Sequence, residues 1–235
     1  IVHSSPVYVG KPQMRWPDTN PFPTTETTKY SYWKASSVIN RTPTLYVGAN
    51  DGMLHGFRAS DGKELLAYVP GSVYSTSTTE GLHYLTDPNY IHRYFVDATP
   101  KISDVYIKTS TSGSAAWRTI LVGSQRGGGN SIFALDVTDP TTFSENNASS
   151  LVLWEFKDPD LGYTFGEPSI VMMNNNKWAV VLGNGYNNEG TGEAQLIILF
   201  IESGIDGTWS VGDYVKISTE TGSSGNKNGL STPAV

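Results

Sequence analysis

Short runs of alternating apolar and polar residues, separated by turns rich in Gly and Asp, recur along most of the 235-residue chain. The clearest example is residues 45–70, LYVGANDGMLHGFRASDGKELLAYVP, in which three runs are joined at Asp51-Gly52 and Asp61-Gly62. Alternation with a period of two predicts strands, and Asp-Gly between apolar runs is a strong hairpin signal because glycine adopts positive φ without steric cost. This stretch predicts a three-strand meander, which together with one preceding strand makes one blade of a β-propeller.

The same unit recurs further along the chain and is lengthened by insertions. A residue followed by Pro marks the start of a first strand, because Pro can occupy that position without losing a ladder hydrogen bond. This start marker falls at Pro6, Pro100, Pro168 and Pro233, and an apolar-Gly end of the second strand falls at Gly48, Gly123 and Gly183. Later strands are predicted at 97–107, 117–123, 131–137, 151–156, 166–171, 177–183, 195–201 and 214–218.

The predicted fold is therefore all-β, a β-propeller of four-stranded antiparallel blades with three blades and the start of a fourth. Blade 1 is expected at about residues 1–70, blade 2 at about 97–157, blade 3 at about 166–219, and the first strand of blade 4 from 230. Propellers close with roughly 4–8 blades. We therefore expect the chain to be a segment of a longer protein, with residues outside it, or another copy, completing the ring.

Two insertions interrupt the repeat. Residues 11–40 lose all periodicity and carry four prolines among the aromatic residues Trp16, Phe22, Tyr30, Tyr32 and Trp33. One interpretation is a loop whose aromatic side chains pack onto a blade, and the other is a partner-binding surface, because loops on a rigid scaffold often carry recognition. Residues 71–96 begin rich in Ser and Thr and end in LTDPNYIHRYFV.

Composition excludes several classes of protein. Only 16% of residues are charged and the formal net charge is −6, with Lys and Arg scattered, so a nucleic-acid partner is not expected. The chain has no cysteine, which excludes disulfides, thiolate metal sites and a Cys nucleophile. Its longest apolar run, residues 194–201, has the length of a strand, so no membrane span is expected.

No catalytic, cofactor-binding or metal site is predicted from the residues. The histidines His3, His55, His83 and His92 lack metal-ligand spacing and are interpreted as hydrogen-bonded strand and loop residues. The glycine-rich residues 123–129 precede a strand rather than a helix, so they are a hairpin turn and not a phosphate cradle. Asp158 and Asp160 lack the further oxygens that a calcium loop needs, and Asn40 and Asn147 fit glycosylation sequons that arise readily by chance.

Several segments together carry a resemblance to a known family: YVGANDGMLHGF and AYVP in residues 46–70, and residues 1–10, 85–96, 134–140, 161–170, 177–187 and 228–235. Quinoprotein-type repeats share the Val-Gly-x-Asn-Asp-Gly blade. Taken together, the segments resemble the PilC/PilY family of large adhesins and biogenesis factors associated with the tip of type IV pili. Nearly the whole chain is covered, in order.

The resemblance implies part of a C-terminal, propeller-like domain of a protein secreted through the periplasm to the bacterial surface. Expected roles are pilus biogenesis, antagonism of retraction, twitching motility and attachment to host or abiotic surfaces, with minor pilins of the tip complex as partners. The calcium loop of the family typically follows the Ser-x-Pro-Ala-Val segment, so calcium is expected in the full-length protein after Val235 and not in this chain. The chain also has no Arg-Gly-Asp, so integrin binding is not supported.

Three function classes remain open. The first is a non-catalytic adhesion and pilus-assembly module that presents residues 11–40 and 71–96 to pilins or host surfaces. The second is a fragment of a quinoprotein-like propeller enzyme, which needs a cofactor-stacking Trp, a calcium site and a catalytic Asp. The third is a purely structural propeller scaffold.

Overall fold

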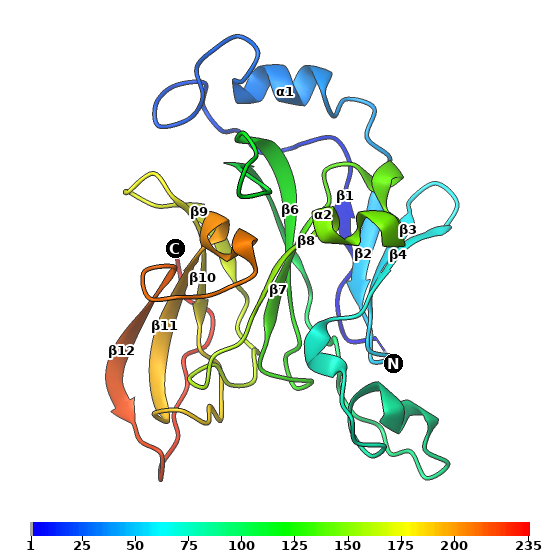
Figure 1. Cartoon of the computed structure of the whole chain (residues 1–235), viewed down its shortest axis with the longest axis vertical. Coiled ribbons are helices and arrows are strands. Elements are labelled where there is room, and N and C mark those ends of the chain that lie inside the picture. The colour runs from blue at the N-terminus through cyan, green and yellow to red at the C-terminus, as the bar shows by residue number, and fades with distance from the viewer. Residues whose placement is uncertain (1) are drawn as a thin grey trace.

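Three four-stranded antiparallel sheets form the computed structural model, which describes residues 2–235 and confirms the predicted all-β class (Figure 1). In each sheet the strands lie side by side in chain order. Blade 1 contains β1 (Val7–Val9), β2 (Thr44–Gly48), β3 (Leu54–Arg58) and β4 (Glu64–Tyr68). Blade 2 contains β5 (Lys101–Ile107), β6 (Ala116–Ser124), β7 (Ile132–Asp136) and β8 (Val152–Phe156). Blade 3 contains β9 (Ser169–Met172), β10 (Trp178–Gly183), β11 (Glu193–Phe200) and β12 (Tyr214–Gly222).

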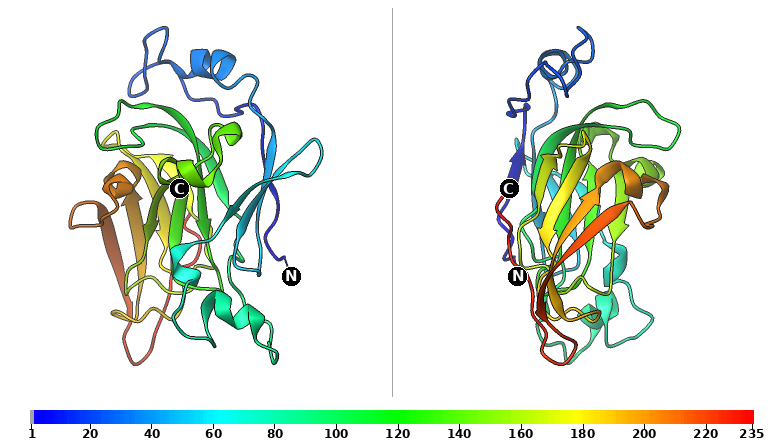
Figure 2. Two further views of the ribbon diagram at one scale, coloured as in Figure 1. Left: turned by 45° about the vertical axis from the view of Figure 1, so that its right-hand side comes forward. Right: turned by 90° about the vertical axis from the view of Figure 1, so that its left-hand side faces the viewer.

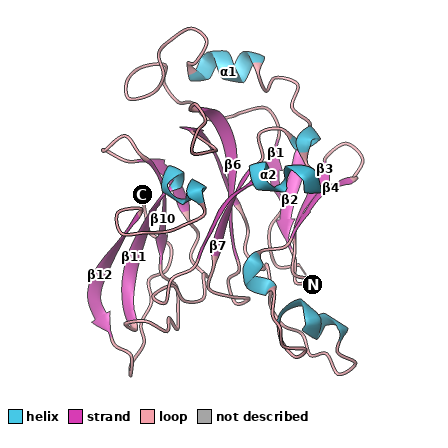
Figure 3. Ribbon diagram, viewed as in Figure 1, coloured by secondary structure: helices cyan, strands magenta, loops and turns pink. Residues whose placement is uncertain are grey.

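The helical segments are short and lie in the connections between strands (Figure 3). They are α1 (Tyr30–Ser36), α2 (Ala148–Leu151) and the 3₁₀ helices η1 (Gly71–Val73), η2 (Gly81–Thr86), η3 (Pro140–Thr142), η4 (Glu145–Asn147) and η5 (Ile201–Asp206). Among the described residues, none of the helices has the length and apolar character that crossing a bilayer requires.

The first strand of each blade neighbours the first strand of the next. β1 contacts β5, and β5 contacts β9, so the sheets fan out from a common line of first strands (Figures 1 and 2). The start markers fit this arrangement, because Pro6, Pro100 and Pro168 each directly precede a first strand. Three blades of a propeller are thus present, as the repeat predicted.

Blade 2 is buried on both faces, and its sequence shows why. Ile120, Leu121 and Val122 are each fully buried in β6. Ile120 and Val122 belong to the core shared with blade 3, whereas Leu121 belongs to the core shared with blade 1. Successive side chains of a strand point to opposite faces, so a continuous apolar run serves two cores at once.

The blades are joined where each second strand ends. A Cβ atom at Gly48 would overlap the carbonyl oxygen of Val96, and one at Gly183 would overlap the carbonyl oxygens of Leu230 and Ser231. Glycine is required there because the chain entering the next blade crosses at backbone contact. Two of the three apolar-Gly ends found in the sequence, Gly48 and Gly183, are therefore junctions between blades, whereas Gly123 lies against the ring of Phe133.

An asparagine one or two residues after each of these two glycines forms a hydrogen bond to the crossing chain. The side-chain oxygen of Asn50 accepts the N–H of Phe95 at 2.9 Å, and that of Asn184 accepts the N–H of Leu230 at 3.1 Å. Their amide nitrogens also donate, Asn50 to the carboxylate of Asp97 and Asn184 to the carbonyls of Asp160 and Glu193. We call this arrangement of Gly48 with Asn50, and of Gly183 with Asn184, the blade junction.

Several predicted boundaries shift in the structure. β5 begins at Lys101 and β9 at Ser169, later than the predicted starts at 97 and 166, because the residues before each Pro belong to the crossing segments. Residues 230–235 lie across Gly183 and form no strand within the described chain, since a strand needs a hydrogen-bonded neighbour. The fourth blade stays a prediction.

The insertion at 11–40 packs onto the blades, and only one of its two interpretations fits. Phe22, Tyr30 and Trp33 are buried in the core shared by blades 2 and 3, and half-buried Trp16 packs against that core. Trp16 also donates its indole N–H to the carbonyl of Asp104 at 2.7 Å. Of the aromatic residues weighed for a partner surface, only Tyr32 is exposed. The expectation that residues 11–40 present their aromatic side chains to a partner was therefore wrong.

We expect Asn184→Ala to lower the free energy of unfolding by about 3 kcal/mol, measured by urea denaturation. Asn184 is fully buried, and its loss leaves backbone donors and acceptors unsatisfied in both the hairpin and the blade junction. Asn146→Ala is the matched control because Asn146 is exposed. Equal stability of the two variants would show that the junction does not depend on this side chain.

Candidate functional site

The two ends of the sheets differ in what covers them. One end carries α1 and the insertion 11–40, and we call it the α1 end (Figure 1). The other carries residues 71–98, the turns 125–131 and 184–192, and the crossing segments 157–168 and 223–231, and we call it the connection end. Residues 71–96 with η1 and η2 project from the connection end, away from α1 (Figures 1 and 2).

A cleft of about 640 Å³ opens at the connection end between segment 71–96 and the blades 2 and 3. Its walls include Arg93, Tyr94, Gly128, Lys157, Tyr163 and Glu189. Those residues come from four segments that are distant in sequence. The cleft is therefore a product of the blade arrangement and not of one local motif.

Glycines of the 125–131 turn allow segment 71–96 to lie close to blade 2. A Cβ atom at Gly128 would overlap the carbonyl of Phe95, and one at Gly127 would touch the ring of Tyr94. The sequence prediction of a hairpin turn here is confirmed, since the turn joins the paired strands β6 and β7. Its glycines have a second role, which is to seat the end of segment 71–96 against the turn.

Gln125 is 1% exposed and lies against Ser72 and Gly129, two residues of the cleft lining. Its side-chain oxygen accepts hydrogen bonds from the hydroxyls of Ser72, at 3.0 Å, and Ser131, at 2.7 Å. Its side-chain nitrogen Nε2 has no hydrogen-bond partner among the described residues. The residues that line the cleft do not include Gln125 itself.

Exposed aromatic side chains concentrate at the connection end. Every large aromatic side chain that is exposed among the described residues lies there except Tyr8 and Tyr32. The residues at the connection end are Tyr74, Tyr90, Tyr94, Tyr163, Phe165 and Tyr186. Contiguous exposed apolar surface on a folded domain marks an interaction site more often than scattered single residues do.

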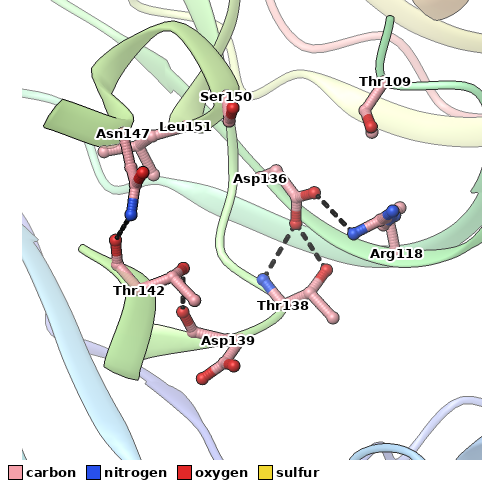
Figure 4. Close-up of a pocket in the computed structure, with 9 residues that line it drawn as sticks. All are labelled: Thr109, Arg118, Asp136, Thr138, Asp139, Thr142, Asn147, Ser150 and Leu151. Carbon is pink, nitrogen blue, oxygen red and sulfur yellow. Dashed lines mark hydrogen bonds and ion pairs between the residues drawn. The ribbon is translucent and has the colours of Figure 1, made fainter. Parts of the chain in front are cut away.

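A second pocket, of about 450 Å³, lies at the α1 end beside α2 (Figure 4). Its acid Asp136 accepts the backbone N–H of Thr138 at 3.0 Å and lies 3.4 Å from the guanidinium of Arg118. Asn147 donates to the carbonyl of Thr142 at 2.8 Å. The hydroxyl of Thr138 also donates to Asp136, so the polar groups drawn in Figure 4 largely bind one another.

The four histidines singled out in the sequence lie on different elements. His3 Nδ1 lies 2.9 Å from the carboxylate of Asp97, and His55 sits between two carboxylates. His92 stacks edge-on against Tyr94, whereas His83 is exposed on η2. The hydrogen-bonded interpretation is confirmed for His3 and His55. Among residues 2–235 no group of three or more His, Asp or Glu side chains has the arrangement of a metal site.

Asp158 and Asp160, weighed as a cation site, are instead bound by a lysine of β12. The Lys216 ammonium lies 3.0 Å from Asp158 and 2.7 Å from Asp160, and Thr191 donates its N–H to Asp160 at 2.7 Å. Burial alone would raise the pKa of Asp160, but hydrogen bonds from Lys216 and Thr191 outweigh it and lower this pKa below its usual value. The lysine supplies the positive charge that a metal ion would bring.

We expect Lys216→Met to lower the free energy of unfolding at neutral pH by about 2 kcal/mol, because it leaves two largely buried carboxylates without their cation. In the wild type the lowered pKa of Asp160 adds stability that is present above about pH 4 and is lost as the pH falls through the folded-state pKa. Urea denaturation between pH 3 and 7 measures both effects.

Lys63→Met is the matched control, since Lys63 is exposed and forms no ion pair among the described residues. Acidification should narrow the gap between Lys216→Met and the wild type, because protonation neutralises the unpaired acids. A gap that widens at low pH would contradict this account.

A second contact that titrates lies in blade 1, at His55. Its Nε2 lies 2.9 Å from Asp51 in the β2–β3 turn, and its Nδ1 lies 2.6 Å from Glu64 in β4. Burial alone would lower the pKa of His55, but the bonds to Glu64 and Asp51 outweigh it and raise this pKa above its usual value. Both ring nitrogens face carboxylates, so the protonated imidazole is the form that satisfies them.

We expect the free energy of unfolding to fall as the pH rises above about 6.5, because a raised histidine pKa stabilises the fold below the unfolded-state value and stops doing so above the folded-state value. His55→Gln should flatten this part of the pH profile. Denaturation midpoints between pH 5.5 and 8.5 provide the measurement. His83→Gln, at an exposed position, should leave the slope unchanged.

Comparison with known proteins places the whole chain in one family. The family model of the PilY1 beta-propeller domain matches residues 1–235. The chain is 39% identical to the type IV pilus biogenesis factor PilY1 of Pseudomonas aeruginosa over 99% of its length, and 40% identical to a PilY1 homolog of Xylella fastidiosa over 87%. It spans 18% and 15% of those two proteins.

A solved structure shows the same architecture. The crystal structure of the Pseudomonas aeruginosa PilY1 C-terminal domain superposes with a TM-score of 0.68 and 36% identity, covering 97% of this chain and 39% of that one. The resemblance noted from the sequence is thereby confirmed. The chain belongs to the PilY1 β-propeller domain family.

Proposed function

We propose that the chain is a non-catalytic module of a type IV pilus biogenesis factor at the bacterial cell surface, and that it contacts its partners through the connection end. Relatives named as type IV pilus biogenesis factors support the pilus association. The observation that carries the choice of surface is the concentration of exposed aromatic side chains at the connection end. Exposed aromatic residues held on a rigid frame are typical anchors of protein interfaces.

The α1 end is a poor alternative for this role. In its insertion, the side chains of Trp16, Phe22 and Trp33 cover the core between blades 2 and 3. Segment 71–96, in contrast, buries Tyr84 and leaves Tyr90 and Tyr94 exposed. Of the two insertions weighed from the sequence, we therefore retain only 71–96 as a recognition surface.

The partners that fit this proposal are minor pilins of the pilus tip complex. Antagonism of retraction, twitching motility and attachment to host or abiotic surfaces follow as properties of the whole protein, which is secreted through the periplasm. Calcium belongs to the same proposal, in a loop after Val235, and no calcium ligand is assigned among the residues of this chain.

To test the proposal, Tyr94→Ser and Phe165→Ser are introduced together into the full-length protein in its own bacterium. Both side chains are nearly half exposed, so the fold should persist while the interface is lost. Pili recovered by shearing, and the amount of the protein that co-purifies with them, should fall several-fold.

Tyr8→Ser with Tyr32→Ser is the control pair, because both residues are exposed outside the connection end. Immunoblots of cell and surface fractions verify equal amounts and equal export of the variants. Unchanged pilus yield and unchanged co-purification in the Tyr94/Phe165 variant would refute the choice of surface.

A further inference from the structure

We infer that the connection-end cleft binds an acidic segment of a protein partner, which it holds by the basic side chains at its walls and rim and by the aromatic residues of its rim. This inference deepens the proposed function, on which it rests, by naming the chemistry of the ligand. Two independent features of the described residues support it: charge and surface composition.

The charge feature comes from basic side chains that have no acidic partner among the described residues. Arg93 donates to the carbonyl of Thr79 and lies over the ring of Tyr84, so its position is fixed while its charge stays uncompensated. Arg93 and Lys157 line the cleft, and Arg126 adjoins it over the ring of Phe165. Each of these residues forms no ion pair among residues 2–235, although the chain as a whole is acidic. Glu189 is the one acid in the lining. Complementary charge sets which partners approach an interface and how fast they associate.

The rim favours a polypeptide over a polysaccharide. Tyr94, Tyr163 and Phe165 stand beside Ser, Gly and Asn residues of the turns at 127–131 and 187–188. Tyr with Ser, Gly and Asn is the composition of antibody paratopes, in which rigid aromatic rings supply contact area and small polar residues adapt to a protein surface. Arg126 over Phe165 extends this rim with a cation–π contact at 5.5 Å.

The test measures binding of short labelled peptides to the full-length protein by fluorescence anisotropy. A peptide of alternating Glu and Tyr should bind, and a peptide of alternating Lys and Tyr should not. Raising the ionic strength should weaken the binding, because exposed charges are screened. Arg93→Gln with Lys157→Gln should weaken it by about tenfold, as expected for the loss of two partly exposed charge contacts.

Arg15→Gln with Lys63→Gln is the control pair, since both residues are exposed cations that form no ion pair within residues 2–235 and lie outside the connection end. Circular dichroism checks that each variant is folded.

Equal binding of the Glu–Tyr and Lys–Tyr peptides, or equal affinity in the Arg93/Lys157 variant, would overturn the inference. So would cleft-dependent binding of polygalacturonate without binding of the Glu–Tyr peptide, which would assign an acidic polysaccharide instead. The pilus assay with Tyr94→Ser and Phe165→Ser separates the two levels. Loss of pilus association without peptide binding refutes only the ligand chemistry, whereas peptide binding with unchanged pilus association refutes the proposed function.

Discussion

The blade junction is the constraint on which the rest of the structure depends. At Gly48 and Gly183 the chain entering the next blade crosses at backbone contact, and an asparagine binds its N–H. The crossing sets where the next first strand begins, and hence how adjacent sheets face each other and which side chains form the shared cores. The contact between blade 2 and the chain that crosses it is different. There the backbone N–H groups of Gln125 and Arg126 donate to the hydroxyl of Thr164 in the crossing chain.

Threonine hydroxyls form further hydrogen bonds between adjacent blades, just before the first strands begin. The N–H of Ser5 donates to the hydroxyl of Thr99 at 2.8 Å, and the N–H of Glu167 donates to that of Thr232 at 2.9 Å. Each bond joins the residue before a start-marker Pro to the residue before the next such Pro in space. The start marker read from the sequence therefore has a physical role at two levels, as a strand start and as a contact between adjacent blades.

Local signals made most of the fold predictable, and distant contacts explain what was missed. The hairpins at Asp51-Gly52 and Asp61-Gly62 depend on residues next to one another, so pattern alone located them. Helix α1 has seven residues and no side-chain cap, and gave no periodic signal. Lys216 lies 58 positions from Asp158, so the sequence could not show that an ammonium fills the space between the two acids. The cleft is likewise composed of segments that only folding brings together.

The same junctions account for the position of the proposed recognition surface at one end of the sheets. Crossing segments at the connection end are held at backbone contact and by buried amides, so aromatic side chains carried there are positioned before a partner arrives. Preorganisation of this kind reduces the entropy lost on binding. At the α1 end, Phe22 and Tyr30 of the insertion pack on Trp117 and Trp178 at the edge of the core. These aromatic side chains of the insertion are therefore buried when the chain folds. Aromatic side chains that complete a core, as Phe22 does, are not available to a partner. Tyr94, which lies against Gly127, stays exposed.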